Sequence, residues 1–200
     1  MSTITQIITT EEDIISYEIF TDETIHNIDF SNMDFDNVIF TKCIFTDCIF
    51  EKASFYEVIF EKCDFSNSNF TKSYFKDCKI KLSKAIGADF SETTIKHTKI
   101  ADSNFSYALF PNAILEHTKI ESCTFAHATL FEATLKTTTI TETNLSSCDI
   151  VGAKLMGVDL STSEISGITL SEGLKELQKV KINTQQAATL VSLLGIEIIE

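Results

Sequence analysis

The stretch TKCIFTDCIFEKASFYEVIFEKCDF, residues 41–65, places a phenylalanine at every fifth residue. An amphipathic helix needs apolar residues every three or four positions, and a half-buried strand needs them at every second position. The five-residue period fits neither element, and it extends far beyond this stretch. Every residue number divisible by five from Phe20 to Leu170 is apolar, and Ala85 is the smallest of these residues. The register never shifts, so we expect no inserted loop anywhere in the array.

A second position, two residues before each of these apolar residues, is almost always small. It holds all six cysteines: Cys43, Cys48, Cys63, Cys78, Cys123 and Cys148. Alternation within a short β segment points both positions inward, and the two remaining residues turn a corner. Repetition of this unit predicts a solenoid whose turns are hydrogen-bonded to one another. We expect the cysteines to be buried thiols, and the alternative is a disulfide between Cys43 and Cys63 on neighbouring turns.

The units NMDFD, KCIFT, KCDFS, NSNFT, GADFS, ADSNF and VGAKL resemble the A(D/N)LXX pattern of the pentapeptide-repeat family. The resemblance covers about residues 18–172. It implies an all-β solenoid in which four pentapeptides form each turn of a right-handed quadrilateral β-helix. We therefore divide the chain into an N-terminal cap (1–17), an uninterrupted repeat β-helix (18–172) and a small C-terminal helix-strand module (173–200). Within the cap we expect a short strand, ITQII, and the alternative is a capped helical turn.

One unit of the array is weak. In SKAIG, residues 83–87, Ala85 takes the place of a large inward residue and Gly87 follows it. One interpretation is a hinge between two halves of the rod. The other is a local cavity that Leu82 or Ile86 fills by turning inward. The unbroken register on both sides favours the cavity, because an unfilled one costs a few kcal/mol.

The last thirty residues predict a different structure. Asn183 is typical of a helix N-cap and Gly195 of the residue after a helix end. Between them one apolar face, which we expect to cover the open end of the rod, comprises Ala187, Leu190, Val191 and Leu194. The remaining apolar groups indicate a two-fold homodimer. The predicted dimer interface comprises Leu190, Leu193, Leu194, Ile196, Ile198 and Ile199. The alternative is a module that only caps its own rod.

The segment INTQQAATLVSLLGIEI, residues 182–198, resembles the tail of the quinolone-resistance branch of the family, the Qnr and MfpA type. This resemblance implies a dimeric acidic rod that binds DNA gyrase and topoisomerase IV in place of DNA. Qnr proteins from Gram-negative bacteria carry projecting loops that help rescue gyrase from the drug, whereas MfpA-type proteins lack them. Since this array has no loop, protection of gyrase and simple inhibition of it both stay open.

Charge gives partial support to DNA mimicry. The net charge is −13, and all 16 basic residues are lysines. Such a chain repels nucleic acid, so we expect no direct nucleic-acid binding. On a four-sided rod one side carries a net charge of −5 and is the predicted partner-binding face. Its acids are Asp29, Glu51, Asp89, Glu92, Glu132, Asp149 and Glu172. However, residues 1–40 hold nine acids and no lysine, so the far tips of a dimer are more acidic than its centre.

Other function classes have little support. The sequence contains no phosphate loop, dinucleotide fingerprint or HExxH motif, so we expect no catalytic residue, metal site or cofactor. His97 and His117 lie 20 residues apart, but two ligands alone make a poor metal site. With no apolar run long enough for a membrane and no signal peptide, we expect a cytoplasmic protein. The rival function is a general protein-interaction scaffold. Its basis is two rows of outward apolar residues: Ile19, Ile39 and Ile59, and Pro111, Phe131 and Val151.

Overall fold

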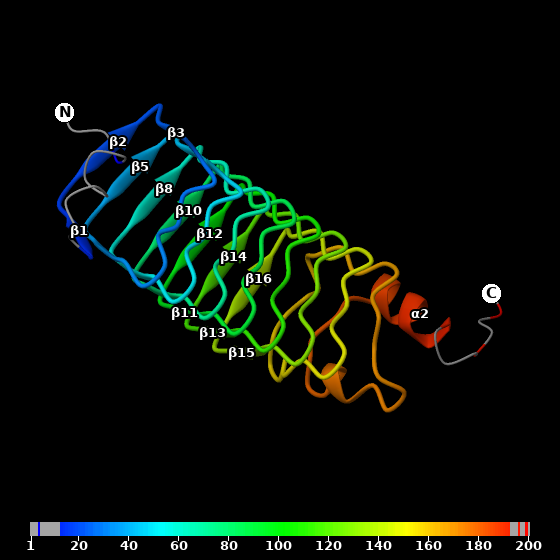
Figure 1. Cartoon of the computed structure of the whole chain (residues 1–200). Helices are drawn as coiled ribbons and strands as arrows, with labels where there is room; N and C mark the ends of the chain where they lie inside the picture. The colour runs from blue at the N-terminus through cyan, green and yellow to red at the C-terminus, as the bar shows by residue number, and fades with distance from the viewer. Residues whose placement is uncertain (1–3, 5–12, 193–195, 197–198, 200) are drawn as a thin grey trace.

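The computed structural model describes Ile4, residues 13–192, Ile196 and Ile199. The chain winds into a rod-shaped parallel β-solenoid, with the N-terminus at one end and the only labelled helix at the other (Figure 1). Paired residues on neighbouring turns are 20 positions apart, such as Ile19 and Ile39. Four pentapeptides therefore make one turn, and the rod has four sides. The predicted fold class, a pentapeptide-repeat β-helix, is confirmed.

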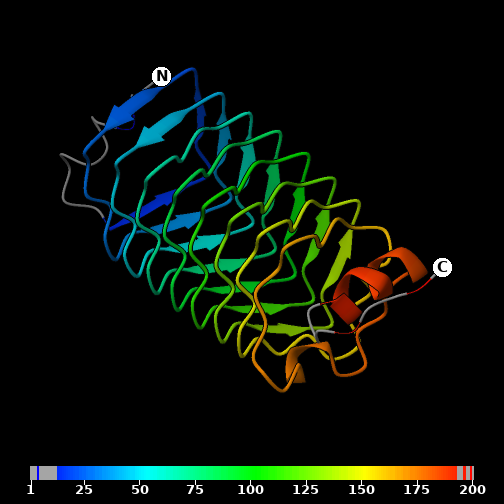
Figure 2. The same ribbon diagram turned by 90° about the vertical axis from the view of Figure 1, so that its right-hand side faces the viewer.

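Two adjacent sides of the rod carry seven-stranded sheets (Figure 2). The first sheet comprises β1 (Ile14–Ser16), β4 (Asp34–Asp36), β7 (Ser54–Tyr56), β9 (Tyr74–Lys76), β11 (Thr94–Lys96), β13 (Ile114–Glu116) and β15 (Thr134–Lys136). The second comprises β2 (Ile19–Thr21), β5 (Ile39–Thr41), β8 (Ile59–Glu61), β10 (Lys79–Lys81), β12 (Lys99–Ala101), β14 (Lys119–Glu121) and β16 (Thr139–Thr141). The third side has β3 (Thr24–His26) and β6 (Ile44–Thr46), and isolated bridges continue it and form the fourth side. We name the sides first to fourth in chain order, so the second side lies opposite the fourth.

The interior consists of columns of identical or similar side chains. On the fourth side the rings of Phe30, Phe50 and Phe70 stack with centroids 4.8 and 4.7 Å apart. The column continues through Phe90 to Phe110 at 4.8 Å steps. This spacing matches the separation of neighbouring strands, so each ring packs directly on the next. Stacked aromatic pairs contribute about 0.5–1.5 kcal/mol each beyond the apolar area that they bury.

The small inward position also carries hydrogen bonds. Its serines and threonines are buried, and all except Ser73, which contacts the Thr93 hydroxyl, bond to backbone groups of the same or a neighbouring turn. For example, Thr93 donates to the Phe70 carbonyl at 2.8 Å, and Ser83 accepts from the Cys63 amide at 3.0 Å. Among the described residues no buried side-chain oxygen or nitrogen lacks a partner. A small polar residue is therefore tolerated inside because the ladder supplies its partners.

The corners depend on left-handed backbone conformations. The second residue after each large inward residue has positive φ at nearly every corner, from Tyr17 (58°) to Ser147 (55°). Such conformations are costly for most residues, so the stacked turns must hold them in place. Gly87 adopts φ 67°, and a Cβ there would lie 2.9 Å from the Asn67 Oδ1 atom. The close approach of the Asn67 side chain therefore explains why this corner holds a glycine.

The weak unit at Ala85 keeps its pairing. The Lys84 amide donates to the Cys63 carbonyl at 2.9 Å, and the Ala85 amide donates to the Asn104 carbonyl at 2.8 Å. The expectation that Leu82 or Ile86 turns inward is wrong, because Leu82 is 44% exposed at a corner and Ile86 is only half-buried. Instead, a cavity of about 10 Å³ remains among Phe60, Phe65, Phe70, Phe75, Ile80, Phe90 and Phe105. Phe65 and Phe105 are the residues directly before and after Ala85 in its column.

The two ends of the rod differ from the repeat. At the N-terminal end β1 already pairs with β4, so strand pairing begins within the predicted cap, while ITQII lies mostly outside the described residues. At the C-terminal end the chain leaves the array through a 3₁₀ turn, η1 (Lys175–Leu177), and forms α2 (Thr184–Ser192). Between them Lys181 bridges to Asp159 and continues the ladder by one position. The domain boundaries 1–17, 18–172 and 173–200 stay a prediction.

Candidate protein-interaction faces

The seven predicted acidic residues all lie on the fourth side or its corner. Asp29, Glu92, Glu132 and Glu172 are exposed, and the other three are half-buried. Bridges along this side pair Asn69 with Asp89 and Thr129 with Asp149, so the acids belong to continuous columns that run along the rod. The structure thus brings these residues onto one side, as the 20-residue register requires.

The three aspartates of this side also hold their own turns. The carboxylate Oδ1 of Asp29 accepts from the Ser31 amide at 2.8 Å, and Asp89 accepts from the Ser91 amide at the same distance. Asp149 accepts from the Val151 amide at 3.0 Å. These side chains stabilise the turn that follows each strand position. Their negative charge remains on the surface, but replacing them changes the turn as well as the charge.

The four glutamates of this side have no such role in a turn. Glu51 forms an ion pair with Lys52 at 3.2 Å, and Glu92 forms one with Lys72 at 3.7 Å. Glu132 and Glu172 form no ion pair with any residue that the structure describes. Exposed ion pairs are weak and screened by salt, so all four carboxylates stay available to a basic partner.

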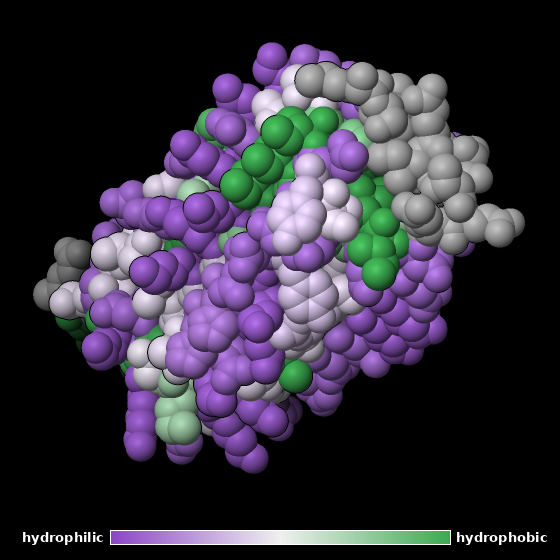
Figure 3. Space-filling view, turned by 90° about the vertical axis from the view of Figure 1, so that its left-hand side faces the viewer, coloured by the Kyte–Doolittle hydropathy of each residue, from purple (hydrophilic) through white to green (hydrophobic). Residues whose placement is uncertain are grey.

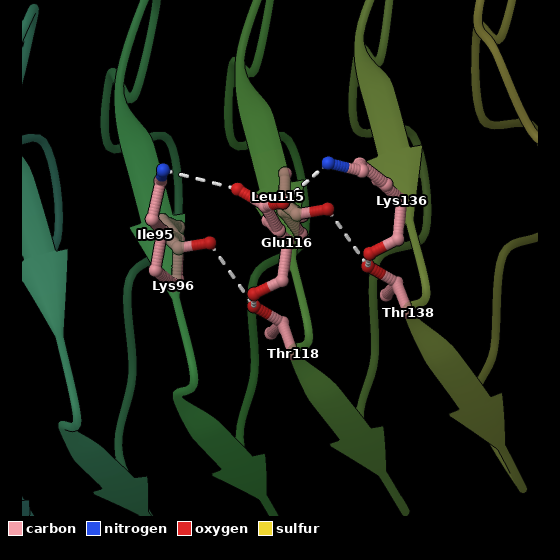
Figure 4. A network of polar contacts seen from close by, with 7 residues as sticks. All are labelled: Ile95, Lys96, Leu115, Glu116, Thr118, Lys136 and Thr138. Carbon is pink, nitrogen blue, oxygen red and sulfur yellow. Dashed lines mark hydrogen bonds and ion pairs between the residues drawn. The ribbon is translucent and has the colours of Figure 1, made fainter.

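Basic residues gather on the first and second sides. On the first side Glu116 lies between two lysines of neighbouring strands, 3.0 Å from the Nζ atom of Lys96 and 2.6 Å from that of Lys136 (Figure 4). Hydrogen bonds from Lys136 and Lys96 lower the pKa of the Glu116 carboxyl to about 2. On the second side Lys99 pairs with Glu121 at 2.8 Å. The rod is therefore acidic on its fourth side and carries lysine rows on the first and second sides.

Side chains with catalytic or metal-binding chemistry do not converge. Within the described part of the chain, no three His, Cys, Asp or Glu residues form a group that could hold a metal ion. The rings of His97 and His117 stack with centroids 4.9 Å apart at a corner of the first side. This stack is a consequence of the 20-residue register, in the same way as the phenylalanine columns.

The cysteines are free and buried, as predicted. Burial raises the pKa of the Cys78 and Cys148 thiols to about 12 and that of Cys123 to about 11. Since the thiolate is the reactive form, these side chains act as small core residues rather than as nucleophiles.

The C-terminal module caps the rod. Asn183 is the helix N-cap as predicted, because its Oδ1 accepts from the Gln186 amide at 2.9 Å and Gln186 Oε1 accepts from the Asn183 amide at 2.8 Å. The Gln186 amide group also donates to the carbonyls of Leu160 and Ser163 at 2.8 and 2.6 Å. These carbonyls belong to the last turn, so the side chain replaces the turn that would follow.

Two capping residues were missed by the sequence analysis. Glu176 is 3% exposed, and its carboxylate accepts from the Gly152 amide at 2.7 Å and from the Ser171 hydroxyl at 2.9 Å. Burial alone would raise the pKa of Glu176, but these hydrogen bonds lower it below its usual range. No local pattern marks Glu176. Gln186, by contrast, stands three residues after the N-cap, which is the spacing of a capping box.

The predicted dimer residues fall into three groups. Leu190 is 6% exposed and packs against the core of its own rod. Ile196 and Ile199 are 53% and 90% exposed. Leu193, Leu194 and Ile198 lie outside the described residues. The structure therefore packs Leu190 of α2 on its own rod and leaves Ile196 and Ile199, beyond the helix, exposed.

Comparison with protein families gives a clear assignment. A model described as "Pentapeptide repeat region" matches residues 53–130, and one described as "Pentapeptide repeats (8 copies)" matches residues 25–51 and 125–161. Together the matches run almost without a break along the solenoid. The chain is a pentapeptide-repeat protein.

Among solved structures, this pentapeptide-repeat protein is similar to two trypsin-treated variants of QnrB1, a plasmid-mediated fluoroquinolone resistance protein. The first has a TM-score of 0.75 and 26% identity, covering 94% of this chain and 99% of that chain. The second has a TM-score of 0.73 and 27% identity, covering 93% and 97%. No curated protein matches the chain. None of the helices in the described residues is long and apolar enough to cross a membrane. The pentapeptide-repeat protein is thus a Qnr-like interaction scaffold, and its fold is that of a non-catalytic family.

Proposed function

We propose that this protein binds DNA gyrase and topoisomerase IV through its acidic fourth side, in place of DNA, and thereby modulates fluoroquinolone sensitivity. The observation that carries the proposal is the similarity to QnrB1 over nearly the whole of both chains. The acidic fourth side supplies the chemistry that a DNA-binding groove would recognise. In this proposal the protein has no enzymatic activity and acts in the cytoplasm, where these topoisomerases meet DNA.

Three glutamates of the fourth side are the best contacts for a basic groove. Glu92 and Glu132 occupy the same left-handed corner position two turns apart, which corresponds to about 10 Å. Glu172 follows Thr169, the last bridged residue of this side, and all three glutamates are exposed. Carboxylates along one side offer lysine and arginine side chains a series of anions, in the way that a phosphate backbone does.

We also propose a homodimer through the C-terminal module. Ile196 and Ile199 are the exposed apolar groups that support it, while Leu190 serves the core of its own rod. A two-fold contact there would join two rods end to end and place the acidic residues of 1–40 at the outer tips. Such a dimer presents a longer acidic surface than one chain can.

The test of gyrase binding is a DNA supercoiling assay titrated with the purified protein, with and without a fluoroquinolone. We expect inhibition of supercoiling or relief of drug inhibition at low protein excess. Charge reversal at Glu132→Lys and Glu172→Lys should abolish the effect, because both carboxylates lie on the fourth side and neither holds a turn. The matched control is Glu57→Lys with Glu142→Lys, which changes the net charge equally at exposed corner positions of the first and second sides.

The possible outcomes distinguish gyrase binding through an acidic face from the rival function, a general protein-interaction scaffold. An effect that is lost in both double variants would show a dependence on net charge alone and would contradict a specific acidic face. No effect of the wild-type protein at large excess would exclude gyrase as the partner, and the scaffold function would then concern another protein.

Dimerisation has an independent test. Sedimentation equilibrium should show a dimer for the wild-type protein and a monomer for Ile196→Lys with Ile199→Lys. Unchanged association of this variant would exclude the C-terminal tail as the interface. Comparing the variant in the supercoiling assay then shows whether gyrase binding needs two rods.

A further inference from the structure

The outer surface of the second sheet changes character halfway along the rod. One outward column follows the strand register from β2 to β14, and its first half consists of Ile19, Ile39 and Ile59. Its second half consists of Lys79, Lys99 and Lys119, each paired with the next turn. This column lies on the side opposite the acidic fourth side, so gyrase binding there would leave it uncovered.

The isoleucine half is accessible. Ile19 is 56% exposed, and Ile39 and Ile59 are half-buried by their neighbours in the sheet. The neighbouring outward column contributes the neutral residues Thr21 and Thr41. A view of the N-terminal end of the rod shows hydrophobic side chains gathered within a largely hydrophilic surface (Figure 3). β-branched residues also favour strands, so apolarity by itself does not define a site, and the adjoining lysines are needed for that.

A hollow of about 380 Å³ adjoins the lysine half. It is lined by Ala101, the smallest outward residue of the second sheet, by Lys79, Lys81 and Lys99, and by the acids Asp102 and Glu121. Lys99 is paired with Glu121 at 2.8 Å. Lys79 and Lys81 form no ion pair within the part of the chain that the structure describes. Three lysines against two acids leave the lining with a net charge of +1, and Lys79 and Lys81 can both meet one incoming carboxylate.

We propose that the second side binds an extended polypeptide segment of a partner protein that lies along the rod. Apolar side chains of this segment pack on Ile19, Ile39 and Ile59, and acidic side chains beyond them meet Lys79 and Lys81, one of them in the hollow over Ala101. A segment that is apolar in one half and acidic in the other matches the column in both halves. This site is independent of the gyrase proposal, since it uses the opposite side of the rod.

The charges favour a polypeptide over other anionic partners. Glu61, Asp102 and Glu121 also lie on the second side, and the chain as a whole carries a net charge of −13. A uniform row of phosphates, in nucleic acid or on an anionic membrane, would meet these carboxylates as well as the lysines. A polypeptide can place acids only opposite lysines and can bury apolar groups on the isoleucines, which nucleic acid would leave exposed.

The probe for this site is a fluorescein-labelled peptide with alternating isoleucines in one half and glutamates in the other. A peptide of the same composition with the two residue types interleaved is the control ligand. In fluorescence anisotropy we expect the wild-type protein to bind the two-part peptide more tightly than the interleaved one. Lys79→Gln with Lys81→Gln should weaken binding about tenfold, since two close ion pairs are lost. Ala101→Leu, which fills the hollow, should weaken it in the same direction.

Matched controls make the test decisive. Lys52→Gln with Lys72→Gln changes the net charge equally on the fourth side and should leave the affinity unchanged. Thermal denaturation of each variant checks that it is folded. Failure of the two-part peptide to bind, equal loss in both lysine variants, or preferential binding of duplex DNA or phosphatidylserine vesicles through Lys79 and Lys81 would each overturn the proposal.

Discussion

Filling the cavity beside Ala85 should stabilise the rod. Ala85→Val adds two carbon atoms where the structure has about 10 Å³ of space lined only by phenylalanine and isoleucine. Burying a methylene group contributes about 0.8 kcal/mol, so two would add about 1.6 kcal/mol. The loss of side-chain entropy and the tight fit in a small space reduce this stabilisation to about 1 kcal/mol. For a chain of this length that corresponds to a rise in melting temperature of about 2–4 °C.

The same substitution at Ala108 is the control. Ala108 is completely buried at a small inward position, and it does not line the cavity beside Ala85. Ala108→Val should therefore lower the melting temperature, because overpacking a filled core costs about 1–3 kcal/mol. Differential scanning calorimetry or circular dichroism measures both shifts.

A loss of stability at Ala85→Val as large as that at Ala108→Val would refute this reasoning. It would mean that the surrounding rings close the space in solution and that position 85 is filled like its neighbours. Amide hydrogen exchange of residues 83–88 adds a second readout. Because the ladder is unbroken there, protection should match that of the adjacent turns, whereas a hinge would exchange faster.

Three further predictions concern the cap, the surface and a corner. Glu176→Gln should destabilise the C-terminal turns near neutral pH, because it weakens the bond from the Gly152 amide. Folding lowers the pKa of Glu176, so the extra stability of the wild-type protein over this variant is fully present above the pKa of an unfolded glutamate, about 4.3. This stability is lost as the pH falls through the pKa of Glu176 in the folded protein, so the denaturation curves of the two proteins should converge in acid. Glu116→Gln should lower the melting temperature slightly at low salt and not at high salt, and its effect should persist in acid until the pH approaches about 2. Gly87→Ala should cost about 1 kcal/mol in urea denaturation, since alanine disfavours φ 67° and its Cβ would press on Asn67, and Gly87→Asn should cost less.

Local repetition made most of the fold predictable. Phe55 and Cys63 could be placed inside from their position in the five-residue unit alone, because each unit repeats the same short strand and corner. Asn183 could likewise be identified as a helix N-cap from its residue type and the apolar pattern that follows. The expectation for Leu82 was wrong because the choice between filling a cavity and leaving it open depends on the surrounding rings, which come from three different turns.

The candidate interaction faces were predictable in composition but not in their contacts. The 20-residue register that the family resemblance implies sorts Glu92 and Glu132 onto one side before any coordinates are known. The register does not reveal that Asp89 holds its own turn, or that the hollow over Ala101 lies beside two lysines without an ion pair. These features depend on rotamers and on the packing of neighbouring turns.

The sequence by itself determined the solenoid and the inward or outward direction of nearly every side chain, and its resemblance to the pentapeptide-repeat family implied the four sides. The directions were predictable because the strict period of five puts every large apolar residue at the same point of a short strand, where alternation points it inward. Only the tertiary structure decided how the rod ends. There the period stops, and Glu176 and Gln186 reach back more than twenty residues to amides and carbonyls that a further turn would have paired. Contacts of this kind join segments without a common repeat, so no local pattern specifies them.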